Sequence, residues 1–128
     1  MKQGLIVALG AGLLAGVGLT AQGNPEAAKL KNPIASTAES QATGKVRYLR
    51  YCANCHGTNG QGSPGNDLIP LTPSLTEEDF QRWSDGEIFE TIKNGVPPEF
   101  NMAAWKDQGF KDEDVWNLVN YIRTLPKK

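Results

Sequence analysis

Apolar residues recur along the C-terminal part of the chain with the period of an α-helix. Between Lys111 and Leu125 they fall at relative positions i, i+3, i+4 and i+7, which places them on one face. These residues are Val115, Leu118, Val119 and Ile122. Acidic residues begin the stretch and Arg123 lies near its end, as the helix dipole favours. Pro126 cannot continue a helix, so the pattern predicts a helix over 111–125 with one buried face.

Two shorter stretches before it also have helix signals. Ser84 and Glu87 have the spacing of a capping box, and Asn94-Gly95 closes the stretch. The apolar members in between are Ile88, Phe89 and Ile92. Thr76, followed by three acidic residues, is typical of another helix start, with the threonine as its cap. We therefore expect a helix over 84–95, preceded by a short helix that starts at Thr76.

A first helix is expected over residues 37–53. Val46 and Leu49 share one of its faces, and Tyr48 and Cys52 share the neighbouring face at i,i+4 spacing. No stretch alternates β-branched and polar residues in the manner of a strand. The pattern as a whole predicts an all-α domain.

The remaining segments have no helical period. Residues 24–40 are rich in Ala, Asn, Pro, Ser and Lys, which is typical of a tether or of a segment that wraps the domain. Residues 57–66 are dense in turn formers and predict a loop. No strand signal precedes this loop and no Lys-Ser or Lys-Thr follows it, which argues against phosphate binding. Prolines within 95–105 predict an extended loop.

The N-terminus has the arrangement of a secretory signal. Met1 and Lys2 precede an uncharged apolar run from Gly4 to Ala21, and Ala21-Gln22-Gly23 suits cleavage. The alternative is an uncleaved anchor, because the run would reach roughly 27 Å as a helix, against a hydrocarbon core of about 30 Å. Both alternatives predict a domain outside the cytoplasmic membrane, either soluble in the periplasm or anchored to the outer face of that membrane.

Length and charge narrow the classes of function. The chain of 128 residues suffices for one domain, which we place at 41–128 after the N-terminal segment 1–23 and a linker 24–40. A net charge of −1 argues against a nucleic-acid partner. Acidic residues outnumber bases strongly between Asp67 and Glu90. This uneven charge would orient a partner or simply face solvent.

The run Cys52-Ala53-Asn54-Cys55-His56 holds both cysteines and the only histidine of the chain. A C-x-x-C-H run is typical of c-type haem attachment, in which each cysteine forms a thioether and the histidine ligates the iron. A zinc site would need Asp or Glu to complete its four ligands. A thioredoxin-like dithiol would need a βαβ context, and a disulfide is the last alternative for exported thiols. The adjacent histidine favours haem.

Residues 44–125 resemble the class I cytochrome c family. In the first helix the matching positions are Gly44, Tyr48 and Cys52, and the C-x-x-C-H run follows. Two later stretches also match: Thr72-Pro73-Ser74-Leu75, and Met102-Ala103-Ala104-Trp105, which stands in place of the family's Met-Pro-x-aromatic loop. In the last helix, Leu118 and Tyr121 match the positions that would cross the first helix at its glycine. The resemblance implies a small all-α fold of three main helices and a short one, wrapped around one covalently attached haem c.

The same resemblance implies the roles of the site residues. Cys52 and Cys55 would hold the haem covalently, and His56 and Met102 would be the axial ligands of its iron. The carbonyl of Pro73 would accept a hydrogen bond from the Nδ1–H of His56, which fixes a ligand histidine. Packing around the haem is implied for Tyr48, Leu75, Trp83 and Trp105.

Some of these roles have competitors. Pro70 lies near Pro73, although only Pro73 has a leucine two residues later. Trp83 would cover the haem edge, reach a propionate or simply belong to the core. Ala103 replaces the family's proline, which leaves the ligand loop less stiff. A lysine or an open site would be the alternative to Met102, although the chain has no second histidine.

Filled axial positions would leave the iron no open site for a substrate, so that it only exchanges one electron. The sequence therefore predicts a periplasmic monohaem electron carrier rather than an enzyme. Its expected partners are redox proteins or subunits of a membrane complex, and the membrane itself if the N-terminal segment is retained. The second hypothesis is a haem subunit built into a larger membrane complex, and the third is a haem ligand sensor or peroxidase.

Overall fold

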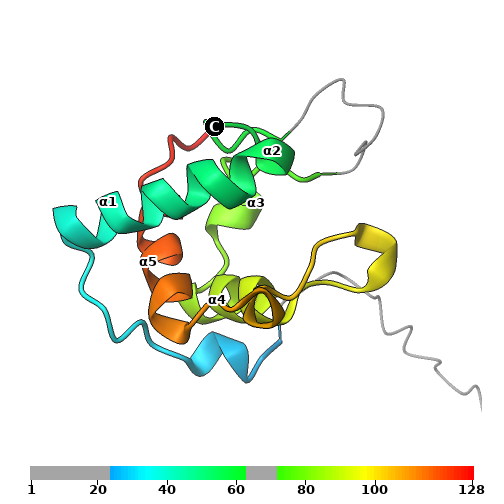
Figure 1. The fold of residues 1–128 in the computed structure, drawn as a ribbon, viewed down its shortest axis with the longest axis horizontal. Coiled ribbons are helices and arrows are strands. Elements are labelled where there is room, and N and C mark those ends of the chain that lie inside the picture. Colours follow the sequence, from blue (N-terminus) through cyan, green and yellow to red (C-terminus); the bar gives the residue numbers. More distant parts are fainter. Residues whose placement is uncertain (1–23, 63–71) are drawn as a thin grey trace, which may run out of the picture.

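The computed structural model describes residues 24–62 and 72–128 (Figure 1). Within these ranges all regular elements are helical and no strand occurs, which confirms the all-α prediction. The α-helices are α1 (Ala38–Arg47), α2 (Ala53–His56), α3 (Glu78–Gln81), α4 (Asp85–Asn94) and α5 (Asp112–Ile122). Shorter turns are η1 (Ala27–Lys29), the π-helical η2 (Tyr48–Cys52), η3 (Pro98–Phe100) and η4 (Trp105–Gln108).

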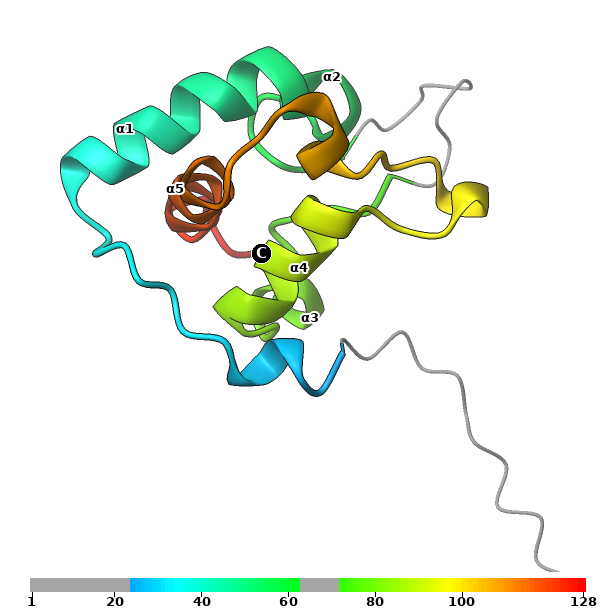
Figure 2. The same cartoon turned by 60° about the horizontal axis from the view of Figure 1, so that its bottom comes forward.

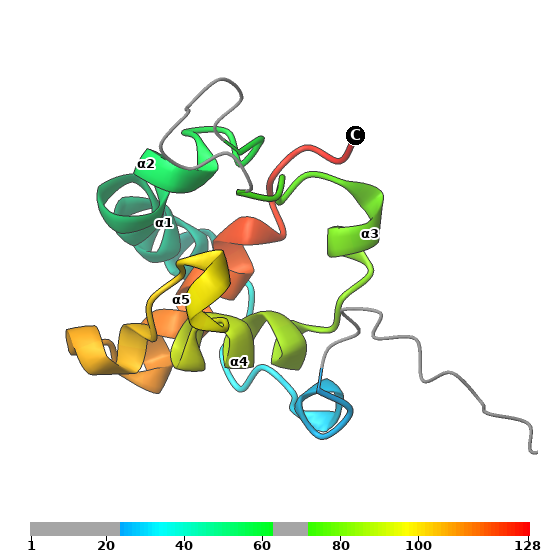
Figure 3. The same ribbon diagram turned by 90° about the vertical axis from the view of Figure 1, so that its right-hand side faces the viewer.

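Helix α5 lies between α1 on one side and α4 on the other (Figures 1 and 3). The crossing of α1 and α5 is close because Gly44 has no side chain. A Cβ at Gly44 would stand 2.0 Å from the backbone oxygen of Asn117 and 2.9 Å from the Cβ of Tyr121. One turn later, the rings of Tyr48 and Tyr121 pack with their centroids 5.2 Å apart. The glycine therefore sets the distance between the two helices.

The core is built by the apolar faces that the sequence predicts for α4 and α5. Its buried members include Ile88, Phe89 and Ile92 from α4 and Val115, Trp116, Leu118, Val119 and Ile122 from α5. The rings of Phe89 and Trp116 stack at 3.9 Å. The capping box of α4 is confirmed, since the Ser84 amide donates to Glu87 Oε2 at 2.6 Å and the Glu87 amide donates to Ser84 Oγ at 3.2 Å.

The first helical segment, α1 followed by η2, buries a different face from the one that carries Val46 and Leu49. These two side chains are 68% and 45% exposed, whereas Tyr48 is fully buried. The reason is the crossing at Gly44, which turns the side of this segment that bears Gly44 and Tyr48 towards α5. The expected cap of α3 is also corrected, because Thr76 is buried and its hydroxyl contacts Ser74 at 2.9 Å, so the residue before the helix is Glu77.

The segment 24–37 wraps the domain and does not extend away from it (Figure 2). Ala27 is buried, and a Cβ at Gly86 would stand 1.9 Å from the Ala27 oxygen, so η1 sits directly on the start of α4. Asn32 Nδ2 donates to Asn120 Oδ1 at 2.8 Å, which ties the segment to α5. Of the two interpretations of this segment, the wrapping one agrees with these contacts; the domain boundary itself stays a prediction.

The N-terminal segment 1–23 and the residues 63–71, with Asp67 and Pro70, lie outside the described residues. Among the helices of residues 24–62 and 72–128, none combines the length and the apolar character that a membrane span requires.

We expect Gly44→Ala to lower the free energy of unfolding by about 1–3 kcal/mol or more, because the new methyl group collides with backbone that cannot move aside. Urea unfolding of the purified protein measures the change. Ala42→Val is the matched control, since Ala42 is exposed on the same helix and its change should stay below about 1 kcal/mol. Equal losses in the two variants would contradict the close crossing.

Candidate functional site

The C-x-x-C-H residues occupy one helical end. Cys52 is the last residue of η2, and Cys55 and His56 lie in the following turn, α2. The chain then turns sharply at Gly57, whose φ is +78° and where a Cβ would stand 2.7 Å from the Gly62 oxygen. Only glycine accepts this conformation without strain. Continuous helical geometry through the motif thus holds the two sulfurs and the imidazole in one neighbourhood.

The His56 imidazole lies in a desolvated position. Burial lowers its pKa, and the backbone of Pro73 acts in the opposite direction with a smaller effect. The Nδ1 atom is buried and forms no hydrogen bond of standard geometry with any described residue, although the Pro73 backbone lies close enough to raise the His56 pKa by hydrogen bonding. A neutral imidazole is the form that binds a metal ion.

Cys52 is half-buried, and its thiol is protonated at neutral pH. Burial, with a contribution from Cys55, raises the pKa of the Cys52 thiol to about 12. Dithiol oxidoreductases need the opposite, a cysteine whose pKa is lowered so that it attacks as a thiolate. This argues against the thioredoxin-like alternative. Within the described part of the chain, no three His, Cys, Asp or Glu side chains gather in a group able to hold a metal ion.

Met102 lies in the loop between α4 and α5 and packs against the core. Gly95, with φ at +72°, begins this loop, and a Cβ there would stand 2.7 Å from the Met102 oxygen. The Val96 amide donates to the Met102 oxygen at 3.1 Å, which closes the loop on itself. Other half-buried side chains that pack against the same core are Cys52, Ala53, Phe80, Trp83 and Trp105. The C-x-x-C-H motif and the Met102 loop therefore pack against the same apolar core.

The other residues that the sequence predicts for the site have different surroundings. Leu75 is buried in the core, and its amide donates to the Gly60 oxygen at 2.7 Å. Trp83 packs its ring on Phe80 at 5.5 Å, and its carbonyl accepts a hydrogen bond from Arg123. Tyr48 lies behind the motif: its hydroxyl donates to the Gly57 oxygen at 2.7 Å and so supports the end of α2 from the core side.

Residues 39–122 match the family described as cytochrome c oxidase, cbb3-type, subunit III. The chain belongs to this family. It is 29% identical over 116 residues to the cbb3-type cytochrome c oxidase subunit FixP of Bradyrhizobium diazoefficiens, covering 84% of this chain and 38% of the relative. It is 33% identical over 100 residues to subunit CcoP of Rubrivivax gelatinosus, covering 72% of this chain and 28% of the relative. The chain spans about a third of the length of these curated relatives.

Solved structures agree with this family. KustC0563 c-type cytochrome is 28% identical, with a TM-score of 0.56 that covers 66% of this chain and 98% of that one. Cytochrome cL from Hyphomicrobium denitrificans is 25% identical, with a TM-score of 0.54 over 72% of this chain and 52% of that one. The chain is a c-type cytochrome domain, an electron carrier, as the sequence predicts.

Membership in a c-type cytochrome family implies a covalently attached haem c, and the side chains of the cytochrome fit such a group. The buried Nδ1 of His56 lacks a hydrogen-bond partner among the described residues, and its ring is held neutral by burial. The Cys52 thiol is neutral for the same reason. An uncharged imidazole and an uncharged thiol, the latter packed against the apolar core, suit a large apolar macrocycle.

One aromatic residue at this site carries no signal in the sequence. Tyr51, directly before Cys52, is 38% exposed. Its ring lies edge-on to Trp105 at 5.8 Å and to Phe110 at 5.2 Å. An aromatic side chain on an exposed helical position does not reveal which distant rings it meets, so only the fold identifies this contact.

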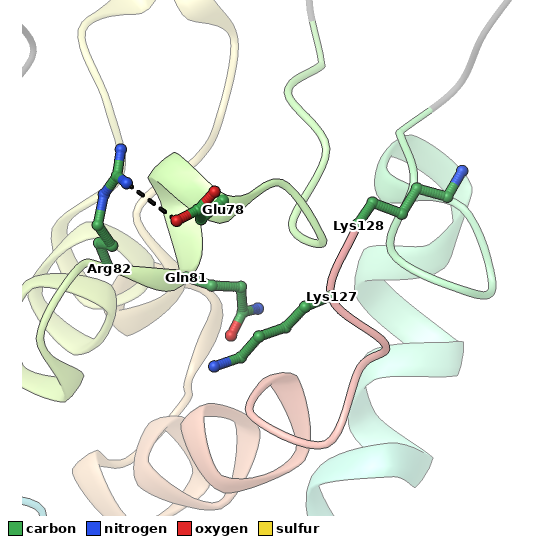
Figure 4. A pocket seen from close by; sticks show the side chains of 5 residues that line it. All are labelled: Glu78, Gln81, Arg82, Lys127 and Lys128. Atoms are coloured by element: carbon green, nitrogen blue, oxygen red, sulfur yellow. Dashed lines mark hydrogen bonds and ion pairs between the residues drawn. The ribbon is translucent and has the colours of Figure 1, made fainter.

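A separate surface hollow of about 360 Å³ lies between α3 and the C-terminus (Figure 4). Its lining residues are Glu78, Gln81, Arg82, Lys127 and Lys128. Arg82 already pairs with Glu78 at 3.2 Å, and none of the predicted haem-binding residues lines the hollow. The hollow is therefore not the haem site of the cytochrome.

We expect Tyr48→Phe to destabilise the cytochrome by about 1 kcal/mol at neutral pH, because the hydrogen bond to the Gly57 oxygen is lost. The variant should also change the pH dependence of stability. Burial raises the pKa of Tyr48 in the folded state, so the unfolded chain releases the phenolic proton first, above about pH 10. The stability that the buried, neutral Tyr48 phenol contributes is therefore fully present below about pH 10 and is lost as the pH rises above that value.

Urea unfolding between pH 8 and pH 11 measures this dependence. The wild-type protein should lose stability more steeply than the Tyr48→Phe variant. Part of the slope should remain in the variant, because burial also raises the pKa of Tyr121. Identical slopes in the two proteins would show that Tyr48 is not the group that titrates.

Proposed function

We propose that the chain is an exported carrier of single electrons with one haem c. Cys52 and Cys55 hold the haem, and His56 and Met102 are its axial ligands. The observation that carries this proposal is the His56 imidazole, which is buried and neutral at the end of the helical segment η2–α2 that bears both cysteines.

Attachment follows from the chemistry of the two thiols. Cys52 and Cys55 would hold the haem by addition of each S–H across one vinyl group, with the sulfur on one carbon and the hydrogen on the other, which needs no external oxidant or reductant. When bound, haem c supplies a one-electron iron couple.

His56 and Met102 set the properties of that couple. The Pro73 backbone beside His56 orients the imidazole and increases its basicity. The Met102 thioether is a neutral, soft ligand that favours the ferrous state and so raises the reduction potential. With both positions occupied by side chains of the protein, small molecules are kept from the metal.

A second candidate function is favoured by the family match. The relatives FixP and CcoP are named as subunits of cbb3-type cytochrome c oxidases. As such a subunit, the chain would pass electrons inside a membrane complex and would not diffuse between partners. The N-terminal residue of the purified protein, together with the cell fraction that contains it, separates the two candidates. Met1 together with oxidase subunits favours the complex, and a start near Asn24 in the soluble fraction favours the free carrier.

We expect Met102→Ala to abolish the weak near-infrared sulfur-to-iron band of the ferric protein. The reduction potential should fall by a sizeable part of the about 0.8 V range that axial ligands span. Phe100→Ala is the matched control from the same loop, because Phe100 is 63% exposed, and it should leave band and potential unchanged. An unaltered spectrum in Met102→Ala would remove Met102 from the site. Rapid binding of carbon monoxide to the reduced wild-type protein would favour a ligand sensor.

The two thioethers are tested by extraction with acidified organic solvent. The denatured wild-type protein should keep its pigment, and so should Cys55→Ala, which retains one bond. The double variant Cys52→Ala and Cys55→Ala should release all of it. Release from the wild-type protein would mean that neither cysteine is bonded to the haem.

A further inference from the structure

Three aromatic rings from three separate segments meet beside the Met102 loop. They are Tyr51 in η2, Trp105 at the start of η4 and Phe110 just before α5. The centroid distances are 5.8 Å from Tyr51 to Trp105, 5.2 Å from Tyr51 to Phe110 and 5.0 Å from Trp105 to Phe110. The rings form a closed triangle, with tilted and edge-on contacts of the kind that aromatic pairs prefer.

The triangle links the predicted attachment helix to the predicted ligand loop. Tyr51 directly precedes Cys52, and Trp105 follows Met102 by three residues. The third ring, Phe110, is fixed from both long helices. The Arg47 guanidinium lies 5.3 Å above its centroid, and Arg47 Nη2 also pairs with Asp114 Oδ1 at 2.5 Å. The cluster is therefore anchored to the α1–α5 crossing.

The other end of the loop is held by its backbone. The Val96 amide bonds to the Met102 oxygen at 3.1 Å, and Lys106 Nζ donates to Asn94 Oδ1 at 2.8 Å. Between these points the loop projects outward, since Phe100 is 63% exposed and Asn101 has a φ of +53°. Met102 is thus held by a hydrogen bond on one side and, through Trp105, by the aromatic cluster on the other.

The identity of residue 103 makes the restraint through Trp105 important for the position of Met102. A proline there would fix the backbone φ angle next to Met102, whereas Ala103 leaves that angle free. Stiffness that residue 103 does not supply has to come from contacts on either side of it. The aromatic contact that follows Ala103 on the C-terminal side is made by the Trp105 ring.

We propose that Tyr51 is a positioning residue for Met102. It acts through Trp105: the ring contact holds the loop against the attachment helix and so keeps the thioether at its ligand position. The inference rests on the proposed function, because it presupposes that Met102 is an axial ligand. The cluster supplies the restraint that proline at position 103 would otherwise give.

Displacement of Met102 by imidazole in the ferric holoprotein tests this role. Loss of one aromatic pair should raise the affinity for imidazole about two- to tenfold, because the bound methionine competes less well. We expect this rise for Tyr51→Leu and for Trp105→Leu. The double variant should rise by less than the product of the two single effects, since the Tyr51–Trp105 contact is lost in either single variant. Tyr51→Phe keeps the ring and should restore the wild-type affinity.

Two further variants complete the design. Phe110→Leu opens the triangle from its third corner and should raise the imidazole affinity as well, so the result does not depend on one variant. Phe89→Leu weakens the stacked Phe89–Trp116 pair in the core. It should lower the urea midpoint and leave the imidazole affinity within about twofold of wild type, which separates positioning from general stability.

The outcomes distinguish this inference from the proposed function. If Tyr51→Leu binds imidazole like the wild-type protein, or if Phe89→Leu raises the affinity as much, the positioning role is wrong although Met102 remains a ligand. If Met102→Ala leaves the near-infrared band and the imidazole affinity unchanged, the ligand assignment itself fails and the positioning role fails with it.

Discussion

The close crossing of α1 and α5 at Gly44 is the constraint on which the rest of the structure depends. With no side chain at this position, the two backbones meet, and Tyr48 one turn later packs on Tyr121. From there the Tyr48 hydroxyl reaches the Gly57 oxygen behind α2. One glycine and one tyrosine thus tie the C-x-x-C-H residues to the α1–α5 crossing.

Burial away from water also determines the charge state of the site's side chains. Burial keeps the His56 imidazole and the Cys52 thiol uncharged, and Cys52 packs against the apolar core. A charged thiolate or imidazolium would be costly in such surroundings. An uncharged nitrogen donor next to an apolar face suits the metal and the ring of a haem. The same burial that stabilises the fold therefore also prepares the ligand.

Local signals explain what could be predicted from the sequence. The capping box of Ser84 and Glu87, the apolar period of α5 and the C-x-x-C-H run each depend on residues a few positions apart, and a helix translates such spacing directly into geometry. The contact between Asn32 and Asn120 joins residues 88 positions apart, and no local pattern encodes it. The exposure of Val46 and the meeting of Tyr51 with Trp105 also depend on how helices cross.

The central claim is that one haem is bonded to Cys52 and Cys55, and the mass of the intact denatured chain tests it most directly. The account predicts that the protein purified after export is heavier than its polypeptide by the mass of one haem, and that digestion places the added mass on the peptide with both cysteines. A chain whose mass equals that of the polypeptide alone would contradict the account.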